Sequence, residues 1–466
     1  MSDETLETDY LVVGAGAAGM AFADALLAHS DATLTIVDRR YAPGGHWIDA
    51  YPYVRLHQPS AFYGVSSVPL GRDVLDTAGT NADYYELAGA DEIRAYFAHV
   101  MHDRFLPDGR VRYFPCSEYL GDGRFVSRFA QGSWSVRVRR KVVDTTYLEG
   151  TVPSTSAPPF EVAEGVCCVP AGEIARVTER PERFVVIGAG KTALDTCVWL
   201  LEQNVSASSI CWIKPREAWW LNRRFQQPLT QLPESYRGMA IQLEAMAQAA
   251  SVEDLFARLE AAEFFLRVDR GFVPSMFRGA VISEAELELL RKIGDVVRLG
   301  HVRRIERDEI VLDEGRVPTS EATVHIHCAA RGLMRRPLRP IFEPGRVTMQ
   351  PFLWGFACYQ FAMLGVIEAL LESDEDKNRL CPPIAYWDAN ADYISAFLST
   401  LANERARMAY PALANWAKET RLNPFGGIGH YRDAPEVIDA RDRIKRYAAT
   451  AVSNLAQLLP RNAART

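Results

Sequence analysis

The sequence predicts an α/β fold with two Rossmann-like units, a helical insertion and a helix-rich C-terminal part. Two glycine-rich turns carry this prediction, at residues 14–19 (GAGAAG) and 188–193 (GAGKTA). Each turn follows a short β-branched run and precedes a helical stretch, and the two turns begin 174 residues apart. Strand, glycine turn and helix in this order form the fingerprint of a dinucleotide-binding unit, and its repetition makes the fold assignment specific.

The first unit covers residues 9–38. A strand is expected at Tyr10–Val13, a helix at Met20–Ala28 and a second strand at Thr33–Val37, which ends on Asp38. Asp38 lies 19 residues after Gly19, where the fingerprint places an acceptor for ribose hydroxyls. The unit is therefore expected to bind a nucleotide cofactor.

The glycines of the first turn have separate roles. Gly14 permits the turn, Gly16 allows a pyrophosphate to approach the backbone, and Gly19 allows the helix to pack closely on the sheet. The start of the helix offers free N–H groups and the positive end of its dipole to the phosphates. The residues expected to contact the cofactor here are Gly14, Gly16, Ala17, Ala18 and Gly19.

Composition is that of an ordinary globular protein. The 466 residues are 48% hydrophobic and 24% charged, with a formal net charge of −7, so about two to four domains and no nucleic-acid partner are expected. The acidic N-terminus lacks an apolar signal segment, which favours a cytoplasmic protein. Eight cysteines are present without a CxxC pair, which favours free thiols and argues against a disulfide reductase.

One apolar stretch, residues 352–371, is long enough to imitate a membrane span. Gln360 and Glu368 interrupt it, and an acidic segment follows at residues 372–376. A buried helix without membrane contact is therefore predicted. Glu368 is expected to be a buried, hydrogen-bonded residue rather than an acid catalyst.

Between the two units, helical spacing predicts a helix at Asp91–Phe105, and alternation predicts strands at Val111–Phe114, Trp134–Val138 and Lys141–Tyr147. Residues 150–159 are rich in Pro, Ser and Thr and are expected to form a linker or long loop.

The second unit predicts a strand at Arg183–Ile187, a helix at Leu194–Gln203 and a strand at Ile210–Ile213. Cations follow this last strand in place of an acid, which favours a coenzyme with a 2′-phosphate, NADPH. The alternative is that they are solvated surface cations. The residues expected to contact NADPH are Gly188, Gly190, Lys191, Thr192, Lys214 and Arg216, with Arg223 as a further cation.

Residues 228–296 are helix-rich, with helices expected at Val252–Leu266 and Glu284–Lys292, and are interpreted as an insertion. Strands return at residues 299–327. His325 and His327 alternate on the last of them, without an acid or cysteine at metal-ligand spacing. They are interpreted as ordinary strand histidines, and no metal site is predicted.

The segment after Asp38, RRYAPGGHW at residues 39–47, resembles the GG-x-W segment of two-dinucleotide-binding-domain flavoprotein monooxygenases. These are class B-like enzymes: flavin-containing monooxygenases, N-hydroxylases and Baeyer–Villiger enzymes. The resemblance continues through an aromatic loop at 49–63, the second glycine turn and the return segment 328–333. It implies FAD in the first unit and NADPH in the second. The further cofactor contacts that it implies are Arg39, Gly45, His46, Trp47, Gln58, Arg331, Gly332 and Leu333.

The resemblance also implies that a late helix directs its N-terminus at the flavin. One departure concerns residues 166–177, which lack the FxGxxxHxxx(Y/F) motif usual before the second turn. This argues against the Baeyer–Villiger and typical flavin-containing subgroups.

The domains expected are 1–178 (first part of the FAD-binding domain), 179–324 (NADPH-binding domain with the insertion) and 325–466 (completion of the FAD-binding domain and C-terminal helices).

The function implied is reduction of FAD by NADPH and oxygenation of a small molecule through a C4a-hydroperoxyflavin, with N-hydroxylation or other heteroatom oxygenation favoured. Gln58 is the nearest match to the family's polar amide beside the flavin; a merely packed loop is the alternative. The candidate catalytic residues are Arg55, His57, Gln58 and Arg223.

The implied partners are the substrate and molecular oxygen, with a homo-oligomer left open. Two other functions stay open: an NADPH reductase or dehydrogenase without oxygen insertion, and a non-catalytic flavin-fold binding protein.

Overall fold

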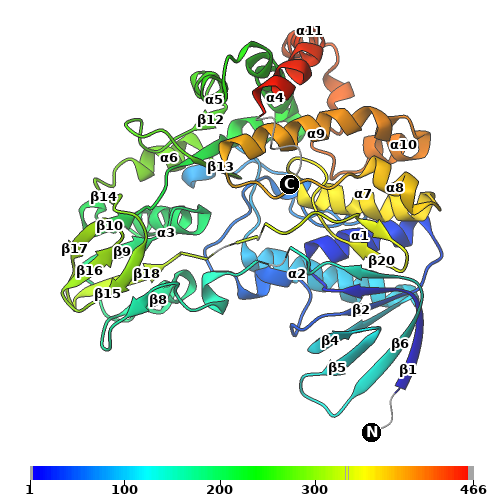
Figure 1. The fold of residues 1–466 in the computed structure, drawn as a ribbon, viewed down its shortest axis with the longest axis horizontal. Coiled ribbons are helices and arrows are strands. Elements are labelled where there is room, and N and C mark those ends of the chain that lie inside the picture. The colour runs from blue at the N-terminus through cyan, green and yellow to red at the C-terminus, as the bar shows by residue number, and fades with distance from the viewer. Residues whose placement is uncertain (1–3, 149, 331, 334, 460–466) are drawn as a thin grey trace.

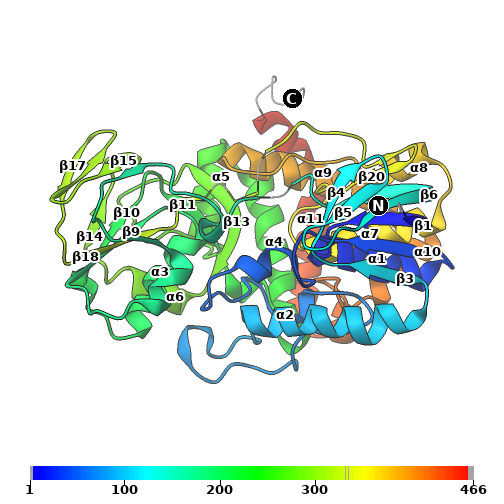
Figure 2. The ribbon, with the colours of Figure 1, turned by 90° about the horizontal axis from the view of Figure 1, so that it is seen from below.

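A computed structural model describes residues 4–148, 150–330, 332–333 and 335–459. Two parallel sheets lie at opposite ends of the molecule, and helices from the insertion and the C-terminal part cover the junction between them (Figures 1 and 2). Both glycine turns follow a central strand of one of these sheets. The predicted α/β fold with two Rossmann-like units is confirmed.

The first sheet has a parallel core in the order β20-β6-β1-β2-β3, with β19 antiparallel at one edge and a β4–β5 hairpin on β6. Helix α1 (Ala17–His29) packs against α7 (Ala357–Leu370) so closely that a Cβ on Gly365 would lie 2.5 Å from the Phe22 carbonyl oxygen. The strands are β1 (Glu4–Val13), β2 (Leu34–Val37), β3 (Val111–Phe114), β4 (Ser117–Gly121), β5 (Arg124–Ser127), β6 (Ser133–Asp144), β19 (Phe342–Glu343) and β20 (Arg346–Thr348).

Two expectations about this region need correction. The strands expected at 134–138 and 141–147 are one strand, β6, because its register against β1 shifts between Thr8 and Tyr10 and accommodates the cations that seemed to interrupt it. Arg139 pairs there with Glu7 and Asp9 at 3.0 Å. The helix expected at 91–105 is α2 (Ala90–His99) followed by a π-helical segment (Val100–Phe105).

The second sheet is parallel throughout, in the order β14-β10-β9-β18-β8, with α3 (Lys191–Glu202) following β9. A separate four-stranded sheet, β17-β16-β15-β7, lies beside it. The strands are β7 (Glu161–Val162), β8 (Cys168–Pro170), β9 (Arg183–Ile187), β10 (Ile210–Ile213), β14 (Asp295–Val297), β15 (Val302–Ile305), β16 (Glu309–Leu312), β17 (Gly315–Pro318) and β18 (Thr323–His327). Because β7 and β8 belong to these sheets, the second unit also includes residues 161–162 and 168–170, which precede the boundary expected at residue 179.

The insertion contains strands as well as helices. A three-stranded sheet joins β12 (Phe265–Leu266) and β13 (Met276–Ile282) of the insertion to β11 (Ala218–Asn222), which precedes it. The helix expected at 252–266 therefore ends early. Helices α4 and α11 pack together, and an aromatic core formed by Phe256, Phe277, Tyr393 and their neighbours joins the insertion to the C-terminal part. The helices are α4 (Leu232–Gln248), α5 (Val252–Ala261), α6 (Glu284–Leu290), α8 (Asp374–Leu380), α9 (Asn390–Met408), α10 (Pro411–Glu419) and α11 (Pro435–Leu458).

The apolar stretch at 352–371 contains the buried helix α7, as predicted. Across the described residues, we find no helix with the length and apolar character needed to span a bilayer. Glu368 on α7 accepts hydrogen bonds from Tyr10 Oη (2.9 Å), Lys377 Nζ (2.7 Å) and Lys141 Nζ (3.2 Å). It is therefore a buried, hydrogen-bonded residue, as expected.

Candidate active site

The first glycine turn lies directly against a second pair of glycines, Gly44 and Gly45. The Gly44 amide donates to the Ala15 carbonyl oxygen at 2.8 Å. A Cβ on Gly45, whose φ is +61°, would lie 2.9 Å from the Cα of Gly16. A side chain on residue 45 would therefore clash with the Gly16 backbone and be strained at this φ, so glycine is needed there. The contact brings His46 and Trp47 beside the N-terminus of α1.

Asp38 directly follows β2, and the first glycine turn holds its side chain in place. Its Oδ2 accepts from the Ala15 amide at 2.6 Å and its Oδ1 from the Arg40 amide at 2.7 Å. Burial raises the pKa of its carboxyl, and these hydrogen bonds oppose that rise. Each oxygen has further lone pairs for ribose hydroxyls. Arg39, next in the chain, is exposed, and its carbonyl oxygen accepts from Arg128.

A cavity of about 380 Å³ lies where the two units meet. Its walls come from the segment after Gly45, from the linker at 152–154, from residues 171–172, from Thr192 on α3 and from Ala357, the first residue of α7. The start of a late helix, α7, therefore reaches the cavity. The sequence-predicted site residues that line it are His46, Trp47, Arg55, His57, Gln58 and Thr192.

The aromatic loop at 49–63 connects the two units across this cavity. Tyr51 Oη donates to Asp195 Oδ2 at 2.7 Å. Tyr53 Oη donates to the Ala171 carbonyl oxygen at 2.9 Å, and its ring stacks on Trp199 with centroids 4.7 Å apart. Sequence reasoning missed both tyrosines as interdomain contacts. Their only signal was the aromatic density of the loop.

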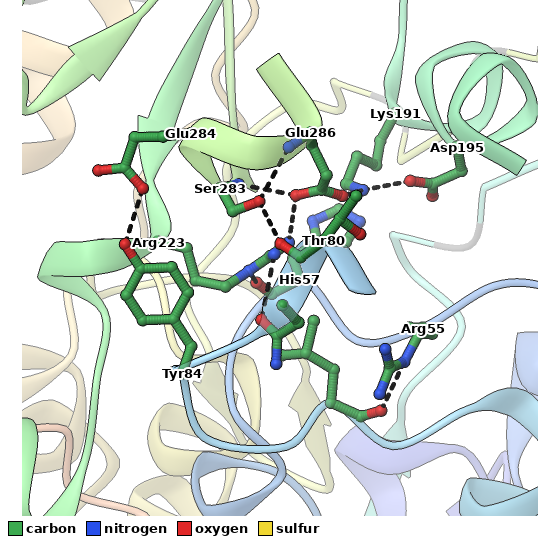
Figure 3. Close-up of polar contacts among 12 residues, drawn as sticks. Arg55, His57, Thr80, Tyr84, Lys191, Asp195, Arg223, Ser283, Glu284 and Glu286 are labelled. Carbon is green, nitrogen blue, oxygen red and sulfur yellow. Dashed lines mark hydrogen bonds and ion pairs between the residues drawn. The ribbon is translucent and has the colours of Figure 1, made fainter. Parts of the chain in front are cut away.

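Four charged side chains form a buried ion cluster (Figure 3): Lys191 and Asp195 of α3, Arg223 after β11, and Glu286 of α6. Lys191 pairs with Asp195, and its Nζ lies 3.5 Å from Glu286 Oε1. Arg223 Nη2 lies 2.8 Å from Glu286 Oε2, and its Nε donates to the His57 carbonyl oxygen at 3.4 Å. The cluster joins the second unit, the insertion and the cavity loop.

The cluster sets the ionisation of its neighbours. Burial opposes charge on Glu286, but Arg223 and Lys191 outweigh it and lower its pKa to about 2. Burial, together with the Lys191 and Arg223 cations, lowers the pKa of His57 to about 3, so its imidazole is neutral at pH 7. Burial raises the pKa of Asp195, opposed by its contacts with Lys191 and Tyr51.

The cations predicted to select NADPH are not brought together. Lys214 is 3% exposed and donates to Glu217 at 2.6 Å, inside the protein. Arg223 is 1% exposed and belongs to the ion cluster. It does not line the cavity, which corrects the expectation that it acts there directly; it positions the backbone at His57 instead. Arg216 alone of the three is half-exposed, with its guanidinium on Asp388.

The second glycine turn leaves open space at its centre. Gly188 has a φ of +147°, and a Cβ there would lie 3.1 Å from the Cys328 carbonyl oxygen. A Cβ on Gly190 would meet nothing within 4 Å, so the N-terminus of α3 is accessible to a phosphate group.

Two parts of the predicted site lie at its margin. In the return segment, Gly332 bridges to Thr151 and Leu333 is exposed, whereas Arg331 lies outside the described residues. Arg55, at the cavity rim, donates to the Leu87 carbonyl oxygen and to Asp76, both at 3.0 Å.

The family model described as "NAD(P)-binding Rossmann-like domain" matches residues 12–63. The chain is 46% identical over 424 residues to the "uncharacterized protein Rv2000" of Mycobacterium tuberculosis (strain H37Rv), covering 90% of this chain and 78% of that protein. The "uncharacterized protein Mb2023" of Mycobacterium bovis matches with the same identity and coverage.

Similar solved structures include cyclohexanone monooxygenase with bound cyclohexanone (14% identity, 95% of this chain and 99% of that chain, TM-score 0.49). A steroid monooxygenase bound to NADP gives the same identity and coverage with a TM-score of 0.48. A flavin-containing monooxygenase from Stenotrophomonas maltophilia is 17% identical over 76% of this chain and 88% of that chain, with a TM-score of 0.39.

Replacing Glu286 by Gln should destabilise the protein by about 3 kcal/mol at pH 7, because buried Arg223 loses its carboxylate partner and Lys191 keeps only Asp195. The folded-state pKa of Glu286 is about 2, below its ordinary value of 4.5. Its contribution is therefore complete above pH 4.5 and is lost as the pH falls toward 2. Urea unfolding at several pH values measures the difference between wild type and variant, which should shrink with acidification.

Glu288→Gln is the matched control, because Glu288 lies on the same helix but is exposed and pairs with Arg291 on the surface. Its effect should stay below about 0.5 kcal/mol. A Glu286→Gln variant no less stable than this control would contradict the role given to the ion cluster.

Proposed function

This chain belongs to the family of the mycobacterial protein Rv2000, and we propose that it is an FAD-containing, NADPH-dependent monooxygenase acting on a small molecule. One observation carries the proposal: a single cavity is lined both by residues that follow the first glycine turn and by Thr192, in the first turn of the helix that follows the second. Two nucleotides bound at these turns would direct their reactive rings into the same space. The volume of about 380 Å³ lies within the range of small-molecule sites.

The residues present fit both cofactors. The Gly16–Gly45 contact leaves no side chain at these two positions beside the N-terminus of α1, and Asp38 lies at the adjacent strand end, which suits FAD. The open space at Gly190 suits the pyrophosphate of NADPH at the N-terminus of α3. When bound, FAD accepts hydride from NADPH and activates molecular oxygen, chemistry that no side chain supplies. In domain terms, we assign FAD to the first sheet with α7 and NADPH to the second.

The chain's own residues would control water and hydrogen bonding in the cavity. Trp47 Nε1 donates to Tyr63 Oη at 2.7 Å, which fixes an aromatic wall. The neutral imidazole of His57 supplies one donor and one acceptor, and the amide of Gln58 supplies two N–H donors and a carbonyl acceptor, without adding charge. Arg223 acts as a positioning residue through the His57 carbonyl oxygen. The wall combines aromatic rings with two charged residues, Asp49 and Arg55, which suits a largely uncharged small molecule, and N-hydroxylation is the reaction that we favour.

Gly190→Val should weaken NADPH binding about 10- to 100-fold while leaving flavin content and melting temperature unchanged. The substituted side chain enters open space rather than protein, so it obstructs the coenzyme and not the fold. Isothermal titration of the flavin-loaded protein with NADP⁺ measures the affinity.

Gly294→Val is the matched control, because Gly294 lies in the same unit and its Cβ would also meet nothing within 4 Å. Its affinity for NADP⁺ should equal that of the wild type. If Gly190→Val binds NADP⁺ as tightly as this control, the second turn is not the coenzyme site.

Gln58→Ala should release hydrogen peroxide about tenfold faster during NADPH oxidation without substrate, while the anaerobic rate of flavin reduction stays the same. The reason is that hydride transfer needs stacked rings, whereas control of oxygen needs hydrogen-bond donors in the cavity. Peroxide release and stopped-flow reduction are measured together, with the surface variant Gln248→Ala as control. Unchanged peroxide release would remove Gln58 from the site and favour a reductase that inserts no oxygen.

A further inference from the structure

Three residues from three parts of the chain meet where β10 ends: Arg216 in the following loop, Arg278 on β13 and Asp388 just before α9. Arg216 Nη1 and Nη2 donate to Asp388 Oδ2 and Oδ1 at 3.0 and 3.2 Å, and Arg278 Nε donates to Oδ1 at 2.7 Å. Burial alone would raise the pKa of Asp388, but the two guanidiniums hold it below its usual value. We call these residues the Arg–Asp–Arg triad.

The triad is accessible to solvent, unlike Lys214 on the same loop. The side chains of Arg216, Arg278 and Asp388 are 39%, 36% and 40% exposed. Lys214, two residues before Arg216, is 3% exposed and is neutralised by Glu217. Arg298, which pairs with Glu217 and Asp269 beside Lys214, is 21% exposed, so the two guanidiniums of the triad are the more accessible cations described at this strand end.

The triad also lies at the correct edge of the second sheet. The Gly188 amide donates to the Ile213 carbonyl oxygen at 3.0 Å, which joins the glycine turn to the end of β10. In a Rossmann unit, the residues after this strand face the 2′ position of the adenosine ribose. A 2′-phosphate bound to this unit would therefore lie at the loop that carries Arg216.

We infer that Arg278 joins Arg216 in binding the 2′-phosphate of NADPH, and that Asp388 competes with this phosphate for the two guanidiniums. The inference rests on the proposed function, because it needs NADPH in the second unit. It adds two specificity-determining residues, one from the insertion and one from the C-terminal part. Asp388 then lowers affinity for NADPH without affecting NADH, which carries no phosphate at that position.

Charge and donor geometry favour the exchange. The triad has two positive charges and one negative charge. A phosphate monoester carries about −1.5 to −2 at pH 7 and three acceptor oxygens, more than a carboxylate. Guanidinium groups bind such oxygens in bidentate fashion. The phosphate can therefore replace Asp388 with a net gain of hydrogen bonds.

The backbone at Asp388 can stay in place during this exchange. Its carbonyl oxygen accepts from the Phe277 amide at 2.8 Å, and its amide donates to Asp392 Oδ2 at 2.9 Å. Only the side chain has to rotate away. The fold of β13 and α9 is therefore compatible with both arrangements.

The test is calorimetric binding of two probes, adenosine 2′,5′-bisphosphate and adenosine 5′-monophosphate, to the flavin-loaded full chain. Asp388→Asn should raise affinity for the bisphosphate about three- to tenfold, and Arg278→Ala should lower it about 10- to 100-fold. Affinity for the monophosphate should not change in either variant. Asp313→Asn is the matched control, since Asp313 is also bound by two side chains, Arg303 and His301, but on the four-stranded sheet; it should change neither affinity.

Several outcomes would overturn the inference. If Asp388→Asn lowers the melting temperature and leaves bisphosphate affinity unchanged, the triad is a structural clamp only. If Arg278→Ala binds the bisphosphate like the wild type, Arg278 is not a ligand. In both cases a wild-type preference for the bisphosphate over the monophosphate leaves the proposed NADPH site intact. A wild-type protein that binds the bisphosphate no more tightly than the monophosphate would overturn the inference together with the NADPH assignment.

Discussion

The ion pair between Arg223 and Glu286 holds together the parts of the molecule on which the cavity depends. Glu286 also faces Lys191 at the start of α3, and Arg223 also contacts the backbone at His57 (Figure 3). The pair therefore fixes the second glycine helix, the insertion and the cavity loop relative to one another. Buried charges of this kind contribute little net stability, but leaving one of them unpaired is costly, so the pair imposes one arrangement on all three segments.

The aromatic loop at 49–63 has a matching role from the side of the first unit. Gly45 is held against Gly16 at its start, and Tyr51 and Tyr53 contact α3 and the segment before β9. The first part of the loop is therefore held between the two units, on the first glycine turn through Gly45 and on the second unit through Tyr51 and Tyr53. Its position explains why the residues after the first glycine turn and those of the second turn share one wall.

Features set by local sequence could be predicted. The glycine turns, the strands that precede them, the buried helix α7 and the environment of Glu368 follow from residue spacing and backbone sterics. The sequence predicts two strands at 134–138 and 141–147, because the register shift on β1 that makes residues 133–144 one strand involves residues more than 120 positions earlier. The strands β7, β8 and β12 are two or three residues long and show no periodicity.

The roles of the cations could not be predicted for a related reason. Lys214, Arg216 and Arg223 lie close together in sequence, yet their carboxylate partners are Glu217, Asp388 and Glu286. Two of these partners come from distant elements, so the sequence could not distinguish a buried structural cation from an accessible one. Arg278, on a strand in a region expected to be helical, gave no signal at all.

The account depends most directly on the two nucleotide sites sharing one cavity. Anaerobic stopped-flow mixing of the flavin-loaded protein with NADPH tests this. We expect complete bleaching of the flavin absorbance in a single phase whose rate saturates with NADPH concentration, because hydride then passes inside a preformed complex. A protein that binds FAD and NADPH but shows no flavin reduction by NADPH would contradict the account.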